Sequence, residues 1–147
     1  AAMARVWRVS AAVGLIGALV LVLGLNGKSA SSCETGEVQG YALVTGTRLT
    51  GPGGIPSRFT NAQRYFGRRY NCTGRLVQVR RVDDGSYIVR FPGNRAVAAL
   101  ADSATDDGSS SSSVSLGGGQ FQVRILRPGI ERNVLEPRDT PFVIALF

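Results

Sequence analysis

The longest apolar run of the chain is Val9–Leu25, which has 17 residues and no charge. It is preceded by the basic residues Arg5 and Arg8 and is followed by Lys28 and a short tract of small residues. A basic start, an apolar middle and a small-residue end are the three parts of a secretory signal. The larger positive charge before the run predicts that the N-terminus stays in the cytoplasm and that the rest of the chain is exported.

Three fates of this N-terminal segment fit its sequence. The small residues Ala30-Ser31-Ser32 would allow cleavage before Cys33. Because a membrane helix needs about 17–25 apolar residues, Val9–Leu25 can instead be retained as an anchor. The third fate is lipidation of Cys33, although Ala30 stands where a lipidation signal has Leu. In each case we expect a signal or anchor over residues 1–32 and an extracytoplasmic domain over residues 33–147.

Apolar and polar residues alternate with period two in two parts of the exported region. Leu76–Val82 and Ser86–Phe91 are rich in β-formers and are joined by the turn signal Asp83-Asp84-Gly85, so this region predicts a hairpin. Gln120–Leu126 alternates in the same way and predicts a further strand, with Gln122 and Arg124 facing outward. The side chains predicted to point into the core are Tyr87, Val89, Phe91, Phe121, Val123, Ile125, Phe142 and Ile144.

Three further apolar segments predict strands, namely Tyr41–Thr45, Ala96–Ala101 and Pro141–Phe147. The last is apolar throughout, which is typical of a strand buried on both faces. Gly, Pro and Ser separate the strands, and the predicted loops are Gly46–Pro56, Asp102–Ser113, Gly117–Gly119 and Arg127–Thr140. The five consecutive Ser of the second loop predict a flexible, solvated connection. This succession predicts an all-β domain, either a β-sandwich or a jelly-roll-like barrel, preceded by the N-terminal hydrophobic helix.

Cys33 and Cys72 are the two cysteines of the chain. An even number of cysteines in an oxidising compartment predicts one disulfide. Closing a loop of about 40 residues would stabilise the domain by roughly 3–4 kcal/mol. The alternatives are two free thiols, or a lipid on Cys33.

The 147 residues include no His. Its absence removes Ser-His-Asp and Cys-His catalysis, His-ligated zinc and the usual proton shuttle near neutral pH. The ten acidic residues lie almost entirely in turn-like contexts, where Asp is common for conformational reasons. We therefore expect no enzymatic activity, no catalytic residues, and no metal or cofactor site.

Basic residues of the exported region are all arginine. Residues 33–147 carry 14 Arg, no Lys and ten acidic residues, a net charge of +4. Arginine binds carboxylate, phosphate and sulfate in a bidentate fashion, but a GC-rich genome also favours arginine over lysine. Aromatic residues interleave with arginine before the predicted hairpin, and the candidate ligand-contact residues are Arg58, Arg64, Tyr65, Arg68, Arg69 and Tyr70.

Two functions remain open for such a region. Aromatic rings and arginine together fit a binding module for acidic glycans or other surface polymers. If half of the aromatic residues are in the core and the arginines are solvated, the domain is a structural or interaction module of the cell surface. The expected partners are then a surface polysaccharide or protein, and a membrane through Val9–Leu25 if that segment is not cleaved. Nucleic acid is not expected, because export removes the usual partner.

From Tyr41 to Phe147 the order of motifs resembles a family of uncharacterised β-rich domains. The matching features are Tyr41-Ala42-Leu43-Val44, Thr73-Gly74 followed by the hairpin up to Gly93, Phe121–Ile125, and Asp139-Thr140-Pro141-Phe142 with the apolar residues after it. Domains of this kind lie at the C-termini of bacterial secreted, surface and collagen-like proteins. The resemblance implies a β-rich fold outside the cytoplasm and no established reaction.

Overall fold

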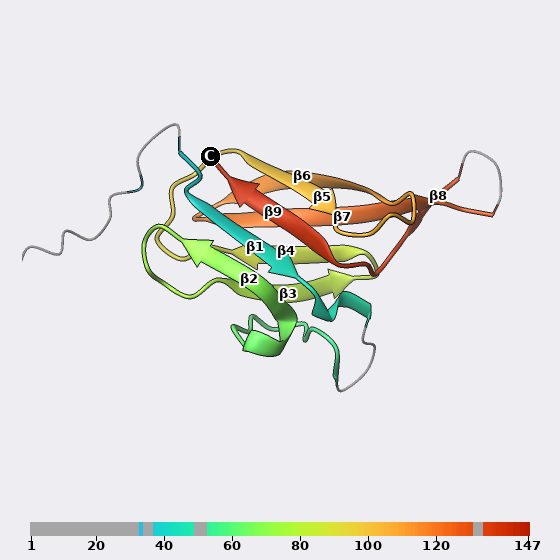
Figure 1. Ribbon diagram of the computed structural model, residues 1–147, viewed down its shortest axis with the longest axis horizontal. Helices are drawn as coiled ribbons and strands as arrows, with labels where there is room; N and C mark the ends of the chain where they lie inside the picture. Colours follow the sequence, from blue (N-terminus) through green and yellow to red (C-terminus); the bar gives the residue numbers. More distant parts are fainter. Residues whose placement is uncertain (1–32, 34–36, 49–52, 131–133) are drawn as a thin grey trace, which may run out of the picture. The chain divides into compact units, whose positions relative to one another are not determined.

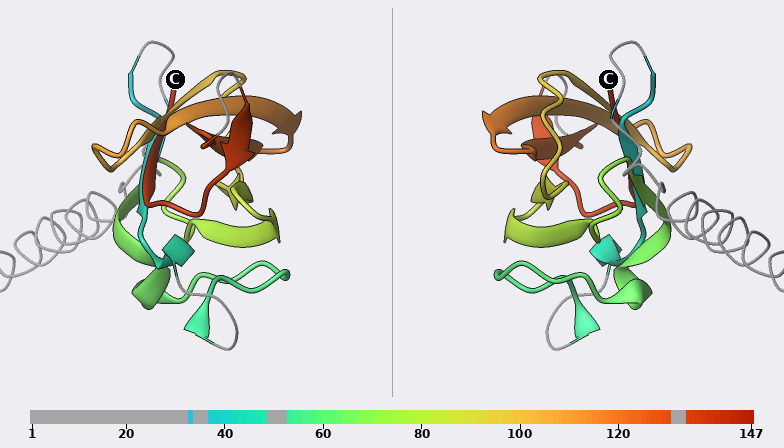
Figure 2. Two further views of the ribbon diagram at one scale, coloured as in Figure 1. Left: turned by 90° about the vertical axis from the view of Figure 1, so that its right-hand side faces the viewer. Right: turned by 90° about the vertical axis from the view of Figure 1, so that its left-hand side faces the viewer.

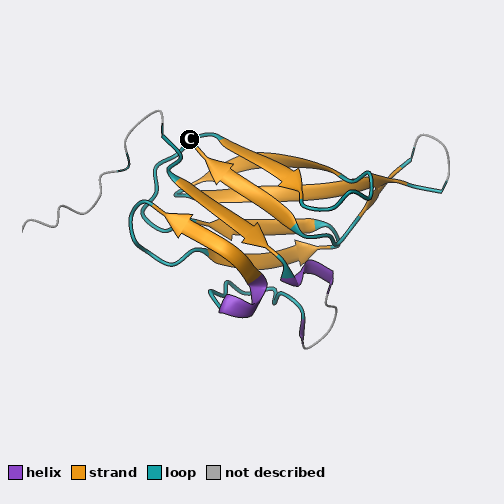
Figure 3. Cartoon of the chain, viewed as in Figure 1, coloured by secondary structure: helices purple, strands orange, loops and turns teal. Residues whose placement is uncertain are grey.

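The computed structural model describes residues 33, 37–48, 53–130 and 134–147, which belong to the compact unit Ser31–Phe147. This part of the chain is all-β, as predicted, with short 3₁₀ turns such as η1 (Gly46–Arg48) and η3 (Gln63–Tyr65) gathered before β2 (Figure 3). Its strands are β1 (Gly40–Val44), β2 (Phe66–Asn71), β3 (Gln78–Asp83), β4 (Ser86–Arg90), β5 (Ala99–Ser103), β6 (Ser110–Gly117), β7 (Gln120–Pro128), β8 (Leu135–Pro137) and β9 (Phe142–Leu146).

The helix predicted over Val9–Leu25 lies outside the described residues. Among the residues that are described, no helix is long and apolar enough to cross a membrane.

The strands form two antiparallel sheets that curl around one core (Figures 1 and 2). Sheet A has the order β2-β1-β9-β5, and sheet B has the order β3-β4-β7-β6, with β8 paired to the end of β7. The first and last strands, β1 and β9, are neighbours, with Ala42 opposite Ile144. Sheet A is therefore assembled from strands that are far apart in the sequence.

The core lies where the inner faces of the two sheets meet. Tyr87 of sheet B packs against Phe142 of sheet A, with ring centroids 5.3 Å apart, and Phe91 meets Phe121 edge-on at 6.5 Å. The eight side chains predicted to be interior are all at most 1% exposed, which confirms the prediction for Tyr87, Val89, Phe91, Phe121, Val123, Ile125, Phe142 and Ile144.

The predicted hairpin is confirmed as the pair β3 and β4, with Val79 opposite Val89. Its turn contains Gly85, whose φ of +60° favours glycine. A Cβ atom there would also lie 2.6 Å from the backbone oxygen of Ile125, so Gly85 is required for close packing as well as for conformation.

The predicted loop Asp102–Ser113 is confirmed only over residues 104–109, because Asp102 and Ser103 belong to β5 and Ser110–Gly117 forms strand β6. Backbone pairing with β7 places Ser111 opposite Ile125 and Ser113 opposite Val123. The Ser111 and Ser113 hydroxyl groups donate hydrogen bonds of 2.7 Å to the carbonyl oxygens of Ala101 and Ala99 in β5. The serines, which were predicted to lie in a flexible, solvated connection, therefore join sheet B to sheet A at this edge.

Two other predictions are corrected in sheet A. The strand predicted over Ala96–Ala101 is shifted, and β5 begins at Ala99. The segment Pro141–Phe147 was expected to be buried on both faces, but in β9 only Phe142, Ile144 and Leu146 are buried, and Val143 is 38% exposed. The outer face of β9 is thus apolar and open.

The predicted disulfide joins Cys33 to Cys72, with the two Cα atoms 5.4 Å apart. It fixes the segment before β1 to the end of β2. The Cys72 sulfur also accepts a hydrogen bond from the buried Asn94 side chain at 3.4 Å. This end of the domain is therefore held covalently and by buried polar contacts.

Candidate functional site

Residues 56–60 run along the free edge of β3. Thr60 and Val79 exchange both of their backbone hydrogen bonds, at 3.0 and 2.9 Å, and the Arg81 amide donates to the Pro56 carbonyl at 3.0 Å. Thr60 is thereby held in an isolated β-bridge, and its hydroxyl accepts a hydrogen bond from the Ala62 amide. Backbone contacts at an otherwise unpaired strand edge thus fix this segment in place.

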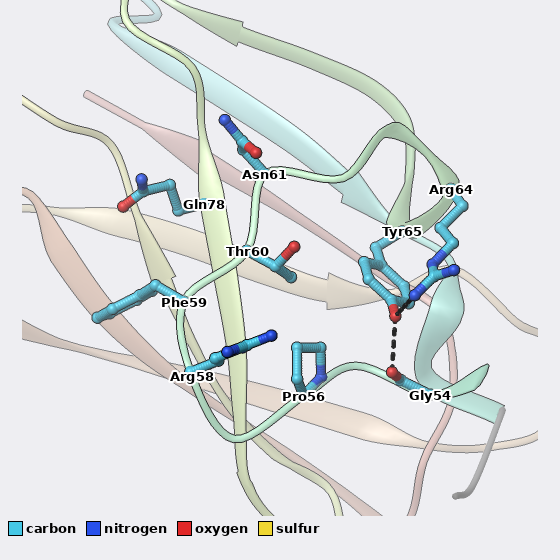
Figure 4. A pocket seen from close by; sticks show the side chains of 9 residues that line it. All are labelled: Gly54, Pro56, Arg58, Phe59, Thr60, Asn61, Arg64, Tyr65 and Gln78. Carbon is cyan, nitrogen blue, oxygen red and sulfur yellow. Dashed lines mark hydrogen bonds between the residues drawn. The ribbon is translucent and has the colours of Figure 1, made fainter. Parts of the chain in front are cut away.

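An open cleft of about 700 Å³ lies between residues 54–61 and the 3₁₀ turn η3. Figure 4 shows that the side chains of Arg58 and Phe59 leave the chain in opposite directions, while Arg64 and Tyr65 extend toward Gly54. We call this feature the arginine cleft, and its lining residues are Gly54, Pro56, Arg58, Phe59, Thr60, Asn61, Arg64, Tyr65 and Gln78.

One wall of the arginine cleft is built on Tyr65, which is only 2% exposed. Its hydroxyl donates to the Gly54 carbonyl at 2.8 Å and accepts from the Arg64 guanidinium at 2.7 Å. The guanidinium carbon of Arg64 also lies 4.8 Å from the centroid of the Tyr65 ring, a cation–π distance. Tyr65 therefore positions Arg64 and presents little ring surface of its own, while Arg64 remains exposed.

The opposite wall is built on Phe59, whose ring is flanked by two arginines of sheet B. The guanidinium carbons of Arg80 and Arg90 lie 5.3 and 5.7 Å from the ring centroid. The buried Nε atoms of both arginines, and the buried Gln78 side-chain oxygen, have no hydrogen-bond partner in the structure. The Phe59 ring lies within cation–π distance of these two arginines.

The charge of the arginine cleft is positive and uncompensated. None of its lining residues is acidic, and the ion pairs found among the described residues are both made by Arg81, with Asp84 and Asp139. In the sequence, residues 38–82 contain eight Arg and no Asp or Glu. This run without acids could have predicted the cleft, but a net charge summed over residues 33–147 conceals it.

The six predicted ligand-contact residues divide between three places. Arg58, Arg64 and Tyr65 line the arginine cleft. Arg69 and Tyr70 border a second cavity of about 310 Å³ beside the disulfide, and Arg69 also donates to the Asn61 carbonyl at 2.7 Å. Arg68 lies on the outer face of sheet A, opposite Leu43. Asn61 and Gln78 were not predicted, because they reach the cleft only through the pairing of this segment with β3.

A separate charged network lies at the hairpin turn. The Asp139 carboxylate accepts hydrogen bonds from Arg81, from the Tyr87 hydroxyl and, at 2.8 Å, from the Gly85 amide. Burial, together with the hydrogen bond to Asp139, raises the pKa of Tyr87 above its ordinary value, so the phenol stays neutral. The contacts tie the β8–β9 connection to the turn, which is a structural role.

The groups present in these sites indicate which chemistry they can support. Across residues 33, 37–48, 53–130 and 134–147, no group of three or more Cys, Asp or Glu side chains is placed to hold a metal ion. The arginine cleft offers guanidinium groups, amides, the Thr60 hydroxyl and the aromatic residues Phe59 and Tyr65. The guanidinium groups can bind an anion by charge-assisted hydrogen bonds.

No protein-family model, curated protein or solved structure matches this chain. The structure alone therefore defines the class of protein. Residues 33–147 form an all-β domain with one disulfide and an open, arginine-lined cleft. The resemblance to β-rich domains of bacterial surface proteins stays a prediction from sequence.

Proposed function

We propose that residues 33–147 form an extracytoplasmic β-sandwich that acts without catalysis, as a module binding acidic glycans or similar anionic polymers of the cell surface. The observation that carries the proposal is the arginine cleft, in which Arg58 and Arg64 are exposed and no lining residue is acidic. A guanidinium group forms paired hydrogen bonds with carboxylate or sulfate. An open cleft also suits a chain that continues past the site on both sides.

Two observations support a place outside the cytoplasm. The sequence begins with a basic tract and the apolar run Val9–Leu25, and this pattern directs export. The Cys33–Cys72 disulfide is of a kind that persists in oxidising compartments. Export by a signal or an anchor would bring the arginine cleft to polymers of the cell surface.

The proposal is tested by affinity electrophoresis of the full chain through gels that contain polygalacturonate, with neutral dextran as the reference polymer. We expect retention by polygalacturonate alone. Replacing Arg58→Gln together with Arg64→Gln should weaken binding about tenfold, as expected for the loss of charge-assisted hydrogen bonds.

The matched control is Arg95→Gln together with Arg124→Gln. Both arginines are exposed and outside the cleft, so this pair changes the net charge equally and should retain nearly full binding. Equal losses in both pairs would mean that net charge alone is responsible, and no retention of the unmodified chain would reject the proposal.

A further inference from the structure

The outer face of sheet A carries several exposed apolar side chains between two charged ones. Strand alternation and register place two rows of side chains across its four strands. The tyrosine row is Tyr70, Tyr41, Ala145 and Leu100, and the charged row is Arg68, Leu43, Val143 and Asp102. Exposed fractions reach 44% for Tyr70 and 70% for Leu100, and a contiguous apolar patch of this kind marks an interaction site.

Strand β9 is more apolar than its partly exposed position requires. Every residue of Phe142–Leu146 is apolar, a pattern typical of strands covered on both faces. Sheet B covers the inner face, and Val143 on the outer face is 38% exposed. Contact with another surface would complete the burial that the sequence indicates.

The charges at the two ends of the charged row indicate which partner surface would cover this face. Arg68 lies on the edge strand β2 and Asp102 on the opposite edge strand β5, with Leu43 and Val143 between them. In the described part of the chain, neither Arg68 nor Asp102 takes part in an ion pair. A row that is basic at one edge and acidic at the other is complementary to itself when reversed.

We propose that the outer face of sheet A binds the same face of a second copy of this chain, about a two-fold axis parallel to the strands and between β1 and β9. This rotation reverses each row and brings Arg68 to the partner's Asp102 and Leu43 to the partner's Val143. Because the contact is isologous, the Arg68–Asp102 ion pair forms twice.

The tyrosine row is complementary under the same rotation. Tyr70 meets the partner's Leu100, and Tyr41 meets the partner's Ala145, so the larger side chains oppose smaller ones. Four strands about 4.8 Å apart and five residues long make a face of about 19 by 17 Å. Two such faces bury about 650 Å² in total, which is below the range of stable specific interfaces, so the dimer should be weak and should depend on protein concentration.

The proposal is tested by cross-linking cysteines in the full chain with a short bifunctional thiol reagent, because two packed sheets lie about 10 Å apart, which is too far for a direct disulfide. Arg68→Cys and Asp102→Cys in one chain lie three strand spacings apart, about 14 Å, which is beyond the reach of a short reagent. The double variant should form a covalent dimer, whereas each single variant should stay monomeric. Peptide mapping should join position 68 of one chain to position 102 of the other and leave Cys33–Cys72 intact.

Matched variants separate this face from general stickiness. Leu100→Glu added to the cysteine pair should abolish cross-linking, while Val114→Glu, at a 61% exposed site on the edge strand of sheet B, should not. Absence of a covalent dimer in the double variant, or equal effects of the two glutamates, would overturn the proposal, as would cross-linking through either single variant.

Sizing of charge variants gives a second readout that adds no cysteine. Arg68→Asp alone should weaken self-association about tenfold, because like charges then meet at both symmetric contacts. Adding Asp102→Arg should restore it. Failure of the second change to restore association would contradict the two-fold arrangement.

Discussion

Residues 38–82 and residues 83–147 both contribute strands to sheets A and B, yet they carry charge in different ways. The first region contains eight Arg and no acidic residue, while the second contains six Arg and eight acidic residues. Most of the buried aromatic side chains of the sheets, including Tyr87, Phe121 and Phe142, come from the second region. The comparison indicates that one region supplies most of the core and the other supplies an open cationic surface.

Arg81 is the link between the two regions. It belongs to the first region, but both of its partners, Asp84 and Asp139, belong to the second. The charge of Arg81 is therefore used for structure, while Arg58 and Arg64 in the same region remain open to solvent. This contrast yields predictions on stability for the second region and on binding for the first.

The largest expected effect is loss of a core aromatic residue from the second region. Phe121→Ala should lower the free energy of unfolding by about 3–5 kcal/mol, as large aromatic side chains do when removed from a core. Arg124→Ala, on the exposed face of the same strand, should cost well under about 1 kcal/mol. Urea unfolding of the two variants measures this contrast, and similar losses would contradict the strand assignment.

The next effect concerns the Asp139 network. Asp139→Ala removes the acceptor of Arg81, of the Tyr87 hydroxyl and of the Gly85 amide, and should cost about 2 kcal/mol. Asp84→Ala removes the other partner of Arg81. Because the Asp84 side chain is 73% exposed, this change should cost less than about 1 kcal/mol. Thermal unfolding compares them, and an equal or greater loss in Asp84→Ala would show that burial does not set the strength of this network.

The smallest stability effect concerns the serines between β5 and β6. Ser111→Ala and Ser113→Ala each remove a 2.7 Å hydrogen bond across the sheets and should each cost about 1 kcal/mol. Ser112→Ala, on the exposed side of the same strand, should cost less than about 0.5 kcal/mol. Hydrogen exchange of the β5 and β6 amides provides a local measurement, and loss of protection in Ser112→Ala alone would disprove the proposed role of the two hydroxyl groups.

The sequence predicted the hairpin and β7 because alternating apolar residues report directly which face is buried. It could not predict β6, since serine has no strong preference for strands and the reason for the strand lies in β5 and β7. The same limit applies to β9, where an apolar run shows that a face can be buried and not what covers it. Period two identified the inward residues of β4 and β7, although Ser86 and Ile88 on the other face of β4 are buried as well.

The candidate site was predicted in part for a related reason. Arg58, Arg64 and Tyr65 were named because aromatic and basic residues interleave locally, and all three line the arginine cleft. Arg68 and Tyr70 point to the outer face of sheet A because they alternate along β2. Gln78 and Phe59 come together through the bridge between Thr60 and Val79, a long-range pairing that composition does not reveal.

The central claim is that Arg58 and Arg64 bind an anionic polymer through specific charge contacts, and the salt dependence of binding tests it most directly. The association constant of the full chain for polygalacturonate would be measured over a range of salt concentrations. Each cation that contacts the polymer releases about one counterion, so log K falls as log salt rises. Arg58→Gln with Arg64→Gln should make this negative slope shallower by about two. Arg95→Gln with Arg124→Gln should leave that slope unchanged. Equal slopes for the unmodified chain and the cleft variant would contradict the account.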